Sequence, residues 1–267
     1  MKKDKNLTTQ ENYVKKYKRN KRKILLLQLT TVVLFFGAWE LFTSVGILDE
    51  FLISKPSAIV RLLGQYIQSK EIFMHIGVSL LETLLGLVIG TILGIFLAIL
   101  LWFSKTLTKI LDPFLVVLNA LPKTALAPIL IIWAGTGIKG IVVVSISLSI
   151  IMTIISAHNF FAHVDEDKIK MLKSFNASKW QIFTKLVLPA NVMNLISIVK
   201  INIGMAWVGV IVGEFLVSRF GIGYLVVYGG QVFKLDLVMM GVFVLAILAY
   251  LMYLIVTLFE KYYRKKR

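Results

Sequence analysis

The most informative stretch of the sequence is KIKMLKSFNASKWQIFTKLVLPANV, residues 168–192. It separates two long apolar runs, and it carries lysines at positions 168, 170, 173, 179 and 185 before a single proline. Spacing along a helix brings its apolar residues near one face and the lysines to the other, which is typical of an amphipathic segment. The apolar residues of that face are Ile169, Leu172, Trp180, Phe183 and Leu186. The chain therefore returns to water here, about two-thirds of the way along.

The middle of this stretch, FNAS, predicts that one helix stops and another begins. Asn176 suits a left-handed residue that closes a helix. Ser178 is typical of an N-cap, and Gln181 three residues later completes a capping box. Pro189 suits the start of the next span, where a missing N–H costs little. Two short helices joined at an elbow can dock a partner or lie on lipid as an interfacial helix.

The composition indicates an all-α polytopic membrane protein. Of the 267 residues, 58% are hydrophobic, whereas a soluble domain is about 45–50% apolar. A bilayer core requires about 20 apolar residues per helix. Six apolar runs of suitable length are predicted to be transmembrane helices, the third of them broken by Pro122 and Pro128: 24–47, 76–103, 114–134, 141–161, 190–217 and 237–259.

The net charge of +16 is concentrated beside the apolar runs, which indicates membrane topology and not nucleic-acid binding. Ten basic residues precede Ile24, and five lie within the last seven residues. We therefore predict basic cytoplasmic tails at 1–23 and 260–267, with both termini inside and multiple spans of the cell membrane. The basic residues can also attract anionic lipid.

The sequence predicts no catalytic, cofactor-binding or metal site in this chain. There is no cysteine, and the three histidines do not form a metal-ligand spacing. GTGIKG at 135–140 matches a dinucleotide-binding pattern, but it joins two membrane spans instead of a strand and a helix, so it predicts a tight external turn. No phosphate-binding loop motif occurs, so any nucleotide must act elsewhere.

Several polar residues within the spans are candidates for a translocation path or gate. Charges inside a membrane are costly and are often functional. The alternative for Glu214 is a structural contact with backbone amides near Gly221. Glu40 and Glu82, nearer to the ends of their spans, could likewise have either a functional or a structural role. For Asn119 and Lys123, beside the breaks in the third span, the alternative is a helix–loop–helix with Lys123 at the membrane interface. The candidates are Asn119, Lys123, Lys200, Asn202 and Glu214.

A stripe of small residues, Gly86, Gly90, Gly94 and Ala98, lies on the second predicted span. Such spacing lets two helices approach closely. It predicts either packing within the chain or a seam between two subunits.

The elbow resembles the cytoplasmic loop of permease subunits of binding-protein-dependent ABC importers. That loop carries E-A-A, three residues, G, nine residues and then I-x-L-P. Here Asn176 stands at the glycine position, and Leu186, Leu188 and Pro189 match the end of the motif. The E-A-A positions are Lys170, Met171 and Leu172, so the acidic residue is displaced, and Glu166 or Asp167 is close enough to substitute. Ala177 and Ser178 complete the residues that the resemblance assigns to ATPase docking.

Three longer stretches look like the nitrate, sulfonate and taurine branch of these importers, which also includes pyrimidine-precursor and riboflavin importers. They are HIGVSLLETLLGLVIGTILGI, LDPFLVVLNALPKTALAPILIIWAG and GMAWVGVIVGEFLVSRFGIGYLV, and FLISKPSAIV resembles the external segment after the first span. The resemblance covers about residues 35–260. It implies a type I importer permease fold with a permease domain at 75–259 and a coupling loop at about 162–189.

The resemblance also implies a set of partners. These are a second permease subunit, more often an identical copy, two cytoplasmic ATPase subunits that bind ATP and magnesium, and an extracytoplasmic solute-binding protein. An ion-coupled secondary transporter that uses Glu214 and Lys200 as its coupling pair is the alternative, and inverted repeats, which we do not find, would support it. A membrane scaffold or intramembrane enzyme is a further alternative, against which the lack of a reactive constellation argues.

Overall fold

The computed structural model describes residues 9–266, and its elements in that range are helices and turns. The chain divides into two compact units, Met1–Leu62 and Leu63–Arg267. The all-α class predicted from the sequence is confirmed.

The first unit is a long helix followed by a capped turn. It contains α1 (Thr9–Ser44), α2 (Glu50–Ile53) and the start of α3 (Pro56–Gln68). Glu40 accepts hydrogen bonds from the Ser57 amide at 3.0 Å and the Ser57 hydroxyl at 2.7 Å. Since Ser57 lies in the first turn of α3, Glu40 satisfies one of the amides that a helix start leaves unpaired.

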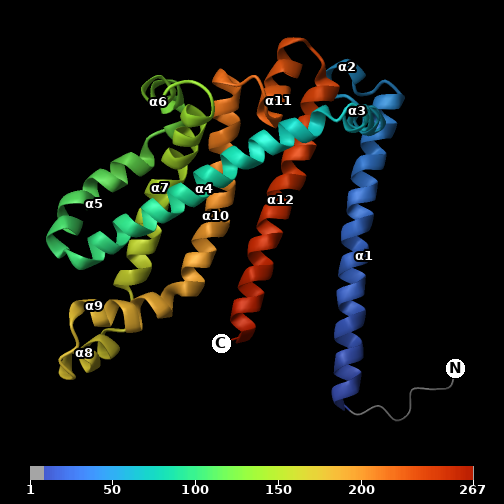
Figure 1. The fold of residues 1–267 in the computed structure, drawn as a ribbon. Coiled ribbons are helices and arrows are strands. Elements are labelled where there is room, and N and C mark those ends of the chain that lie inside the picture. Colours follow the sequence, from blue (N-terminus) through green and yellow to red (C-terminus); the bar gives the residue numbers. More distant parts are fainter. Residues whose placement is uncertain (1–8, 267) are drawn as a thin grey trace. The chain divides into compact units, whose positions relative to one another are not determined.

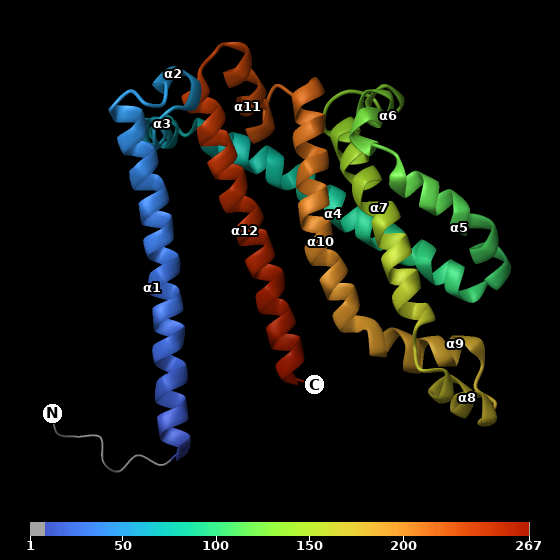
Figure 2. The same ribbon diagram turned by 180° about the vertical axis from the view of Figure 1, so that it is seen from behind.

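The second unit holds the remaining helices (Figures 1 and 2). Helix α7 packs against both α4 and α10, and α12 packs against α10 and α11. The elements in chain order are α4 (Glu71–Phe103), α5 (Lys105–Ala120), η1 (Lys123–Leu126), α6 (Ala127–Ala134), α7 (Ile138–Ala162), α8 (Glu166–Ser174), α9 (Lys179–Ile182), η2 (Phe183–Val187), α10 (Leu188–Val217), α11 (Ile222–Gln231) and α12 (Leu235–Lys266).

The small-residue stripe on α4 is used for packing within the chain. A Cβ added at Gly86 would lie 2.1 Å from Oγ of Ser145 on α7, and one at Gly90 would lie 2.3 Å from Oγ of Ser149. Such distances are far inside van der Waals contact, so these glycines let α4 and α7 approach closely. The intrachain alternative predicted for the stripe is confirmed.

Glycines also allow α10 to approach α7 closely. A Cβ at Gly209 would lie 2.5 Å from the Cα of Ser145, and one at Gly213 would lie 3.0 Å from the Cα of Ile141. Because the obstructing atoms are backbone, a larger residue here would have to move a whole helix. The three central helices α4, α7 and α10 therefore form a tight bundle.

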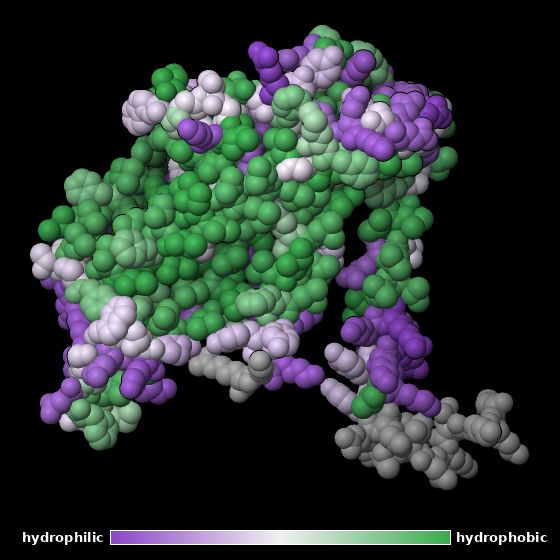
Figure 3. All heavy atoms as spheres, in the orientation of Figure 1, coloured by the Kyte–Doolittle hydropathy of each residue, from purple (hydrophilic) through white to green (hydrophobic). Residues whose placement is uncertain are grey.

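Five helices of the described chain are long and apolar enough to cross a membrane, and a bent pair could form a sixth span. The five are Tyr13–Ser44, Glu71–Phe103, Ile138–Ala162, Lys179–Val217 and Leu235–Lys265. The bent pair, Lys105–Ala120 with Lys123–Ala134, turns by 87°. Figure 3 shows hydrophobic surface over α4 and α5 and hydrophilic residues gathered over α8 and α9.

The bent pair corrects the predicted third span. That span was expected to begin near Phe114 and to break at both Pro122 and Pro128. Instead α5 begins at Lys105, and the chain bends once, at Pro122. Pro128 lies in the first turn of α6, where its missing N–H interrupts no helical hydrogen bond.

The helices also extend through the segments predicted as basic tails. Helix α1 begins at Thr9 and α12 continues to Lys266, while residues 1–8 lie outside the described range. Lysine and arginine are good helix formers. Charge therefore marks the expected edge of the membrane and does not end the helix.

Candidate functional site

The polar segment between α7 and α10 forms a helical elbow. Helix α7 ends at Ala162, α10 begins at Leu188, and α8, α9 and η2 lie between them. Figures 1 and 2 show α8 and α9 at the opposite end of α7 and α10 from α6 and α11. The elbow thus interrupts the run of membrane-spanning helices at one end of the bundle.

Helix α8 closes on a left-handed residue, as predicted. Asn176 has a φ of 55°. The Ala177 amide donates to the Leu172 carbonyl at 3.1 Å, and the Asn176 amide donates to the Lys173 carbonyl at 2.9 Å. These two bonds are a Schellman motif, which satisfies the last carbonyls of a helix.

Helix α9 begins with the predicted capping box. The Gln181 amide donates to Ser178 Oγ at 3.2 Å, and the Ser178 amide donates to Gln181 Oε1 at 2.8 Å. Only one residue, Ala177, separates the left-handed Asn176 from this cap. The elbow therefore has a defined shape that local hydrogen bonds set.

The base of the elbow is a π-helical turn, η2. The Leu188 amide donates to the Phe183 carbonyl, five residues back. Pro189 follows in the first turn of α10. A proline donates no hydrogen bond and crowds the carbonyl four residues before it, which here belongs to Lys185. The widened turn accommodates both effects and lets α10 continue from the elbow.

Phe183 anchors the elbow to the ends of the neighbouring spans. Its side chain is 2% exposed, and its ring centroid lies 5.1 Å from that of Trp102, 5.5 Å from Phe103 and 5.5 Å from Phe161. Trp102 and Phe103 end α4, and Phe161 ends α7. Aromatic contacts at these distances are favourable. Movement of the elbow therefore moves the ends of α4 and α7.

Large apolar residues remain on the outer surface of the elbow. Met171 is 54% exposed, Phe175 is 75% exposed and Trp180 is 62% exposed. The face predicted from helical spacing is thus divided, since Phe183 is buried and Trp180 is mostly exposed. Several large apolar side chains exposed on a polar segment are typical of an interaction site.

The residues assigned to ATPase docking by the resemblance lie along this elbow in two groups. Six are exposed: Glu166, Asp167, Lys170, Met171, Asn176 and Ser178. Five are half-buried: Leu172, Ala177, Leu186, Leu188 and Pro189. The exposed group surrounds the Schellman turn, and the half-buried group lies toward the base.

The two candidate acidic residues differ in their partners. Asp167 pairs with Lys170 one turn later, at 3.1 Å. Glu166 is exposed and forms no ion pair with any residue in the described part of the chain. Glu166 is therefore the carboxylate that is available to a partner.

At the other end of α10, Glu214 is a buried helix cap. Its side chain is 1% exposed. Oε2 accepts the amides of Gly223 at 2.6 Å and Tyr224 at 3.3 Å, and Oε1 accepts the hydroxyl of Ser79 at 2.6 Å. Gly223 and Tyr224 lie in the first turn of α11, whose unpaired amides and dipole favour a carboxylate. Glu214 therefore makes the contact with backbone amides that was predicted as the alternative to a role in the translocation path.

The turn before α11 leaves room only for glycine. Gly221 has a φ of +106°, and a Cβ there would lie 2.3 Å from the Glu214 carboxyl group. Its amide donates to Nδ1 of the buried His75 at 3.1 Å, and the Ile222 amide donates to Ser79 Oγ at 2.8 Å. Two residues of α4 thus hold the turn in place together with Glu214.

Asn202 forms a node between the three central helices. It is fully buried on α10, and its Nδ2 donates to Oγ1 of Thr91 on α4 and Oγ1 of Thr153 on α7, both at 2.8 Å. Hydrogen bonds between polar side chains hold membrane helices together. This node lies inside the bundle formed by one chain.

Lys200 pairs with Glu260 of α12 and lies 5.5 Å from the ring centroid of Tyr253. Lys200 and Glu214 are 14 positions apart on one helix, which is about 21 Å along its axis. They have separate partners, so the structure does not bring together the coupling pair of a secondary transporter.

Asn119 and Lys123 do lie together. Lys123 Nζ donates to Asn119 Oδ1 at 3.3 Å, across the bend between α5 and η1. The five candidate path residues therefore fall into four separate places in this chain and do not line one site. Their role in transport stays a prediction.

Sequence reasoning missed His75 and Ser79, which complete the Glu214 cluster. A signal was present, since His75, Ser79 and Glu82 continue the glycine stripe of α4 at helical spacing. A turn is present over the first half of GTGIKG, where Gly135 and Gly137 have φ of 91° and 82°, and residues 138–140 already belong to α7. That the turn is external stays a prediction.

Residues 90–267 match the family model described as "Binding-protein-dependent transport system inner membrane component". The match covers the end of α4 and all of α7, the elbow, α10 and α12. The chain belongs to this family and is a multi-pass permease subunit of an importer.

Individual relatives agree with that class. A probable ABC transporter permease protein of Haemophilus influenzae is 27% identical, over 86% of this chain and 93% of that protein. A putative aliphatic sulfonates transport permease protein of Bacillus subtilis is 26% identical, over 95% of this chain and 92% of that protein.

A bacterial ABC transporter involved in the import of the acidic polysaccharide alginate contains a chain of similar fold. The TM-score is 0.64 with 15% identity, and the match covers 94% of this chain and 99% of that chain. At this identity the likeness concerns the fold alone.

Proposed function

We propose that this permease subunit pairs with a second copy of itself and that two cytoplasmic ATPase subunits grip the two elbows. ATP and magnesium would bind on the ATPase subunits. An extracytoplasmic binding protein would deliver a small solute to the path between the permeases. The resemblance to the sulfonate-type branch and the sulfonate permease relative support a solute of the nitrate, sulfonate, taurine, pyrimidine-precursor or riboflavin class.

The observation that carries this proposal is the anchoring of the elbow by Phe183. A surface that only rests on lipid needs no rigid link to two other spans. Here the buried ring fixes the elbow to the ends of α4 and α7, while Phe175 and Trp180 face outward. ATPase closure that pulls on the outward residues would therefore shift α4, α7 and α10 together. Transport by alternating access requires contacts that differ in strength between two states, and such a link would supply them.

Glu166 would supply the charged contact that the displaced E-A-A motif lacks. It lies in the first turn of α8 and has no ion pair within the described residues. A basic residue of the ATPase could approach it from solvent. Exposed ion pairs contribute about 0.2–1 kcal/mol, so Glu166 would favour orientation more than affinity.

The elbow would face the cytoplasm, and so would both ends of the chain. The lysines of residues 168–185 and the basic residues at both ends support this orientation, since cytoplasmic loops are enriched in lysine and arginine. Helices α6 and α11 would then lie near the extracytoplasmic surface.

Reconstitution tests this function. The permease is placed in proteoliposomes with its cognate ATPase subunit and binding protein, and uptake of the binding protein's ligand is measured with ATP inside. We expect uptake that requires both ATP and the ATPase. Uptake by the permease alone, driven by an ion gradient, would contradict the proposal and favour a secondary transporter.

A further inference from the structure

Lys179 connects the elbow to the end of α4. It is the first residue of α9, and its Nζ donates a hydrogen bond at 2.5 Å to the carbonyl of Phe103, the last residue of α4. The same ammonium group lies 5.7 Å from the ring centroids of both Trp102 and Phe103. A cation within about 6 Å of an aromatic ring is attracted to its face. Lys179 therefore makes three favourable contacts with the end of a helix that precedes it by 76 positions.

The charge of Lys179 stabilises α4 and not the helix on which the residue lies. The last carbonyls of a helix have no partner within it, and a positive charge beside them interacts favourably with the helix dipole. Lys179 provides α4 with a donor and with the charge. It also begins the continuous helical stretch Lys179–Val217, and a positive charge at the N-terminus of a helix is unfavourable. A lysine at this position is therefore explained by its contact with α4.

Lys179 and Phe183 attach the elbow to α4 at two points, one helical turn apart. Trp180 adds to the first point, because its ring stacks on that of Phe103 with centroids 5.9 Å apart. The two attachments differ in kind. The buried ring of Phe183 makes apolar contacts, and hydrophobic burial has no preferred direction. The hydrogen bond from Lys179 is directional, so it fixes the angle between the elbow and α4.

A second hydrogen bond extends this connection to α7. Trp102 Nε1 donates to the carbonyl of Phe161, near the end of α7, at 3.1 Å. The end of α7 is thus bonded to α4 through Trp102, and the end of α4 is bonded to the elbow through Lys179. The two bonds join the three elements in series.

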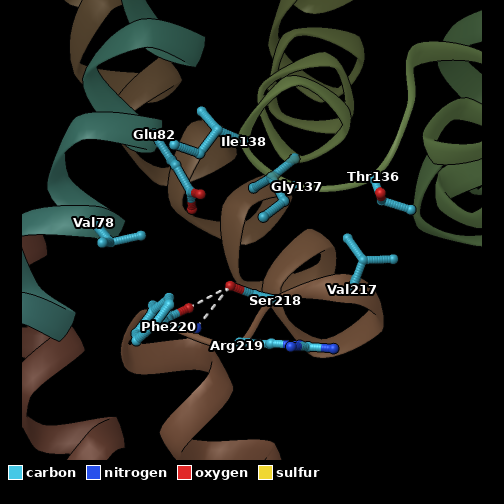
Figure 4. Close-up of a pocket in the computed structure, with 10 residues that line it drawn as sticks. Val78, Glu82, Thr136, Gly137, Ile138, Val217, Ser218, Arg219 and Phe220 are labelled. Carbon is cyan, nitrogen blue, oxygen red and sulfur yellow. Dashed lines mark hydrogen bonds between the residues drawn. The ribbon is translucent and has the colours of Figure 1, made fainter.

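Helix α4 extends from this contact to the opposite end of the bundle. It is one continuous helix, and Val78 lies 25 positions before Phe103, which is about 37 Å along the axis. A cavity of about 590 Å³ is lined there by Val78 and Glu82 of α4 together with Val217 and Ser218 at the end of α10. Figure 4 shows the two α4 residues on one side of this space and Val217 on the other. A change in the direction of α4 at Phe103 would therefore displace one wall of the cavity.

We propose that Lys179 is a positioning residue for transport, which fixes the angle of the elbow on α4 so that α4 follows the elbow when the elbow moves. The proposal rests on the proposed function, because the ATPase would be what moves the elbow. Without the ammonium group, the elbow would stay attached through Phe183 but would rotate about it. Part of the movement would then end at the elbow, and more ATP would be hydrolysed for each solute imported.

Distances within the permease test the fixed angle. The chain has no cysteine, so spin labels can be attached at Lys105→Cys, at the start of α5, and at Phe175→Cys, on the exposed turn of the elbow. The labelled chain is mixed with an excess of unlabelled permease in lipid nanodiscs, and double electron–electron resonance measures the distance within one chain. Lys179→Met keeps an unbranched side chain at an exposed position. It should make the distance distribution about twice as broad, because the directional bond is lost.

Two further variants are the controls. Lys179→Arg keeps a charged donor and should give the wild-type distribution. Lys185→Met removes the same charge from an exposed lysine of η2 that forms no ion pair with the residues that the structure describes, so it should also leave the distribution unchanged. A wild-type distribution in Lys179→Met would overturn the proposal.

Reconstituted transport tests the consequence for coupling. With the ATPase subunit and the binding protein present, Lys179→Met should hydrolyse about five times more ATP per solute imported than the wild type, which corresponds to about 1 kcal/mol, the net contribution of one hydrogen bond. Lys179→Arg and Lys185→Met should keep the wild-type ratio. A purely structural role would lower hydrolysis and uptake together and leave the ratio unchanged, and that result would contradict the positioning role.

This proposal and the proposed function can fail separately. The distances are measured in the permease alone, so they can contradict the Lys179 contact while ATP-driven uptake is normal. Crosslinking of the elbow to the ATPase subunit distinguishes the two causes of an unchanged ratio. With crosslinks present, an unchanged ratio in Lys179→Met contradicts the role of Lys179 alone, whereas the absence of crosslinks contradicts the proposed function.

Discussion

A side-chain helix cap lies near each end of α10, on α9 at the elbow and on α11 at the other end, and the two caps differ in their surroundings. At the elbow, Ser178 and Gln181 cap each other in full contact with solvent. At the other end, Glu214 caps α11 from a position that is 1% exposed, with help from Ser79 on a different span. The elbow thus keeps a fixed shape while its surface stays accessible. The buried end locks three helices together and offers little to a macromolecular partner.

This difference predicts that substitutions at the two ends have different consequences. Changes in the Glu214 cluster should lower stability, because they leave buried donors without partners. Changes in the elbow should spare the fold and alter communication with the ATPase.

The largest effect should come from Glu214→Ala. It leaves the buried Ser79 hydroxyl and the amides of Gly223 and Tyr224 without an acceptor. We expect a loss of about 3 kcal/mol or more in the free energy of unfolding, which corresponds to a midpoint lower by roughly 6–12 °C. Thermal unfolding in detergent measures it.

Glu214→Gln is the matched control for that substitution. It keeps the shape and one acceptor oxygen, so the midpoint should fall less, and the protein should insert normally. If uptake is lost while stability is fully retained in Glu214→Gln, a path role for the charge outweighs the capping role.

Gly221→Ala should have the next largest effect on stability. Its φ of +106° is strained for alanine, and the new Cβ would lie 2.3 Å from the Glu214 carboxyl group. We expect a cost of about 2 kcal/mol, read from the same unfolding midpoint. Gly230→Ala, in α11 with open space around its Cα, is the control and should be nearly neutral. Equal midpoints for the two variants would refute the close approach.

Asn176→Val should lower the free energy of unfolding less than Gly221→Ala does, but it should impair the coupling of ATP hydrolysis to transport. A β-branched residue resists positive φ, at roughly 1–2 kcal/mol, so the Schellman turn should be distorted. We expect more ATP hydrolysed per solute imported in proteoliposomes. Asn176→Gly preserves the left-handed backbone and should retain the wild-type ratio. A normal ratio in Asn176→Val would show that this turn does not set coupling.

The contrast between the two ends also explains what the sequence could predict. The turn and the cap of the elbow depend on contacts between residues at most five positions apart, such as Ala177 with Leu172, so the residue types alone indicated the left-handed turn and the capping box. The anchoring of Phe183 against α4 and α7 is long-range and was not predicted. The Glu214 cluster joins residues 135 to 146 positions apart, as in Ser79 with Glu214 and His75 with Gly221. No local pattern encodes such a pairing. The charge in a span marked Glu214 as unusual, and backbone amides near Gly221 were named as an alternative partner, but Ser79 on α4 could not be identified.

Prediction of the membrane spans was limited in the same way, because it too relied on local properties. Long apolar helices such as α4 and α7 were predicted within a few residues, because their length and composition are local properties. The break between α5 and α6 was predicted correctly at Pro122, but the second predicted break, at Pro128, was wrong, because Pro128 fits within the first turn of α6. Whether a proline bends a chain depends on its place in the helix, which apolar composition does not fix.

Site-specific crosslinking determines whether the ATPase subunit grips the elbow. The chain contains no cysteine, so single cysteines can be introduced without background. Phe175→Cys and Ser178→Cys lie on the exposed part of the elbow, and Lys139→Cys, on an exposed residue at the opposite end of the bundle, is the control. We predict that both elbow cysteines crosslink to a cysteine in the groove of the ATPase subunit, at a rate that changes with bound nucleotide, and that Lys139→Cys does not. Elbow cysteines that fail to crosslink and are instead quenched by lipid-embedded probes would contradict the claim and identify the segment as an interfacial helix.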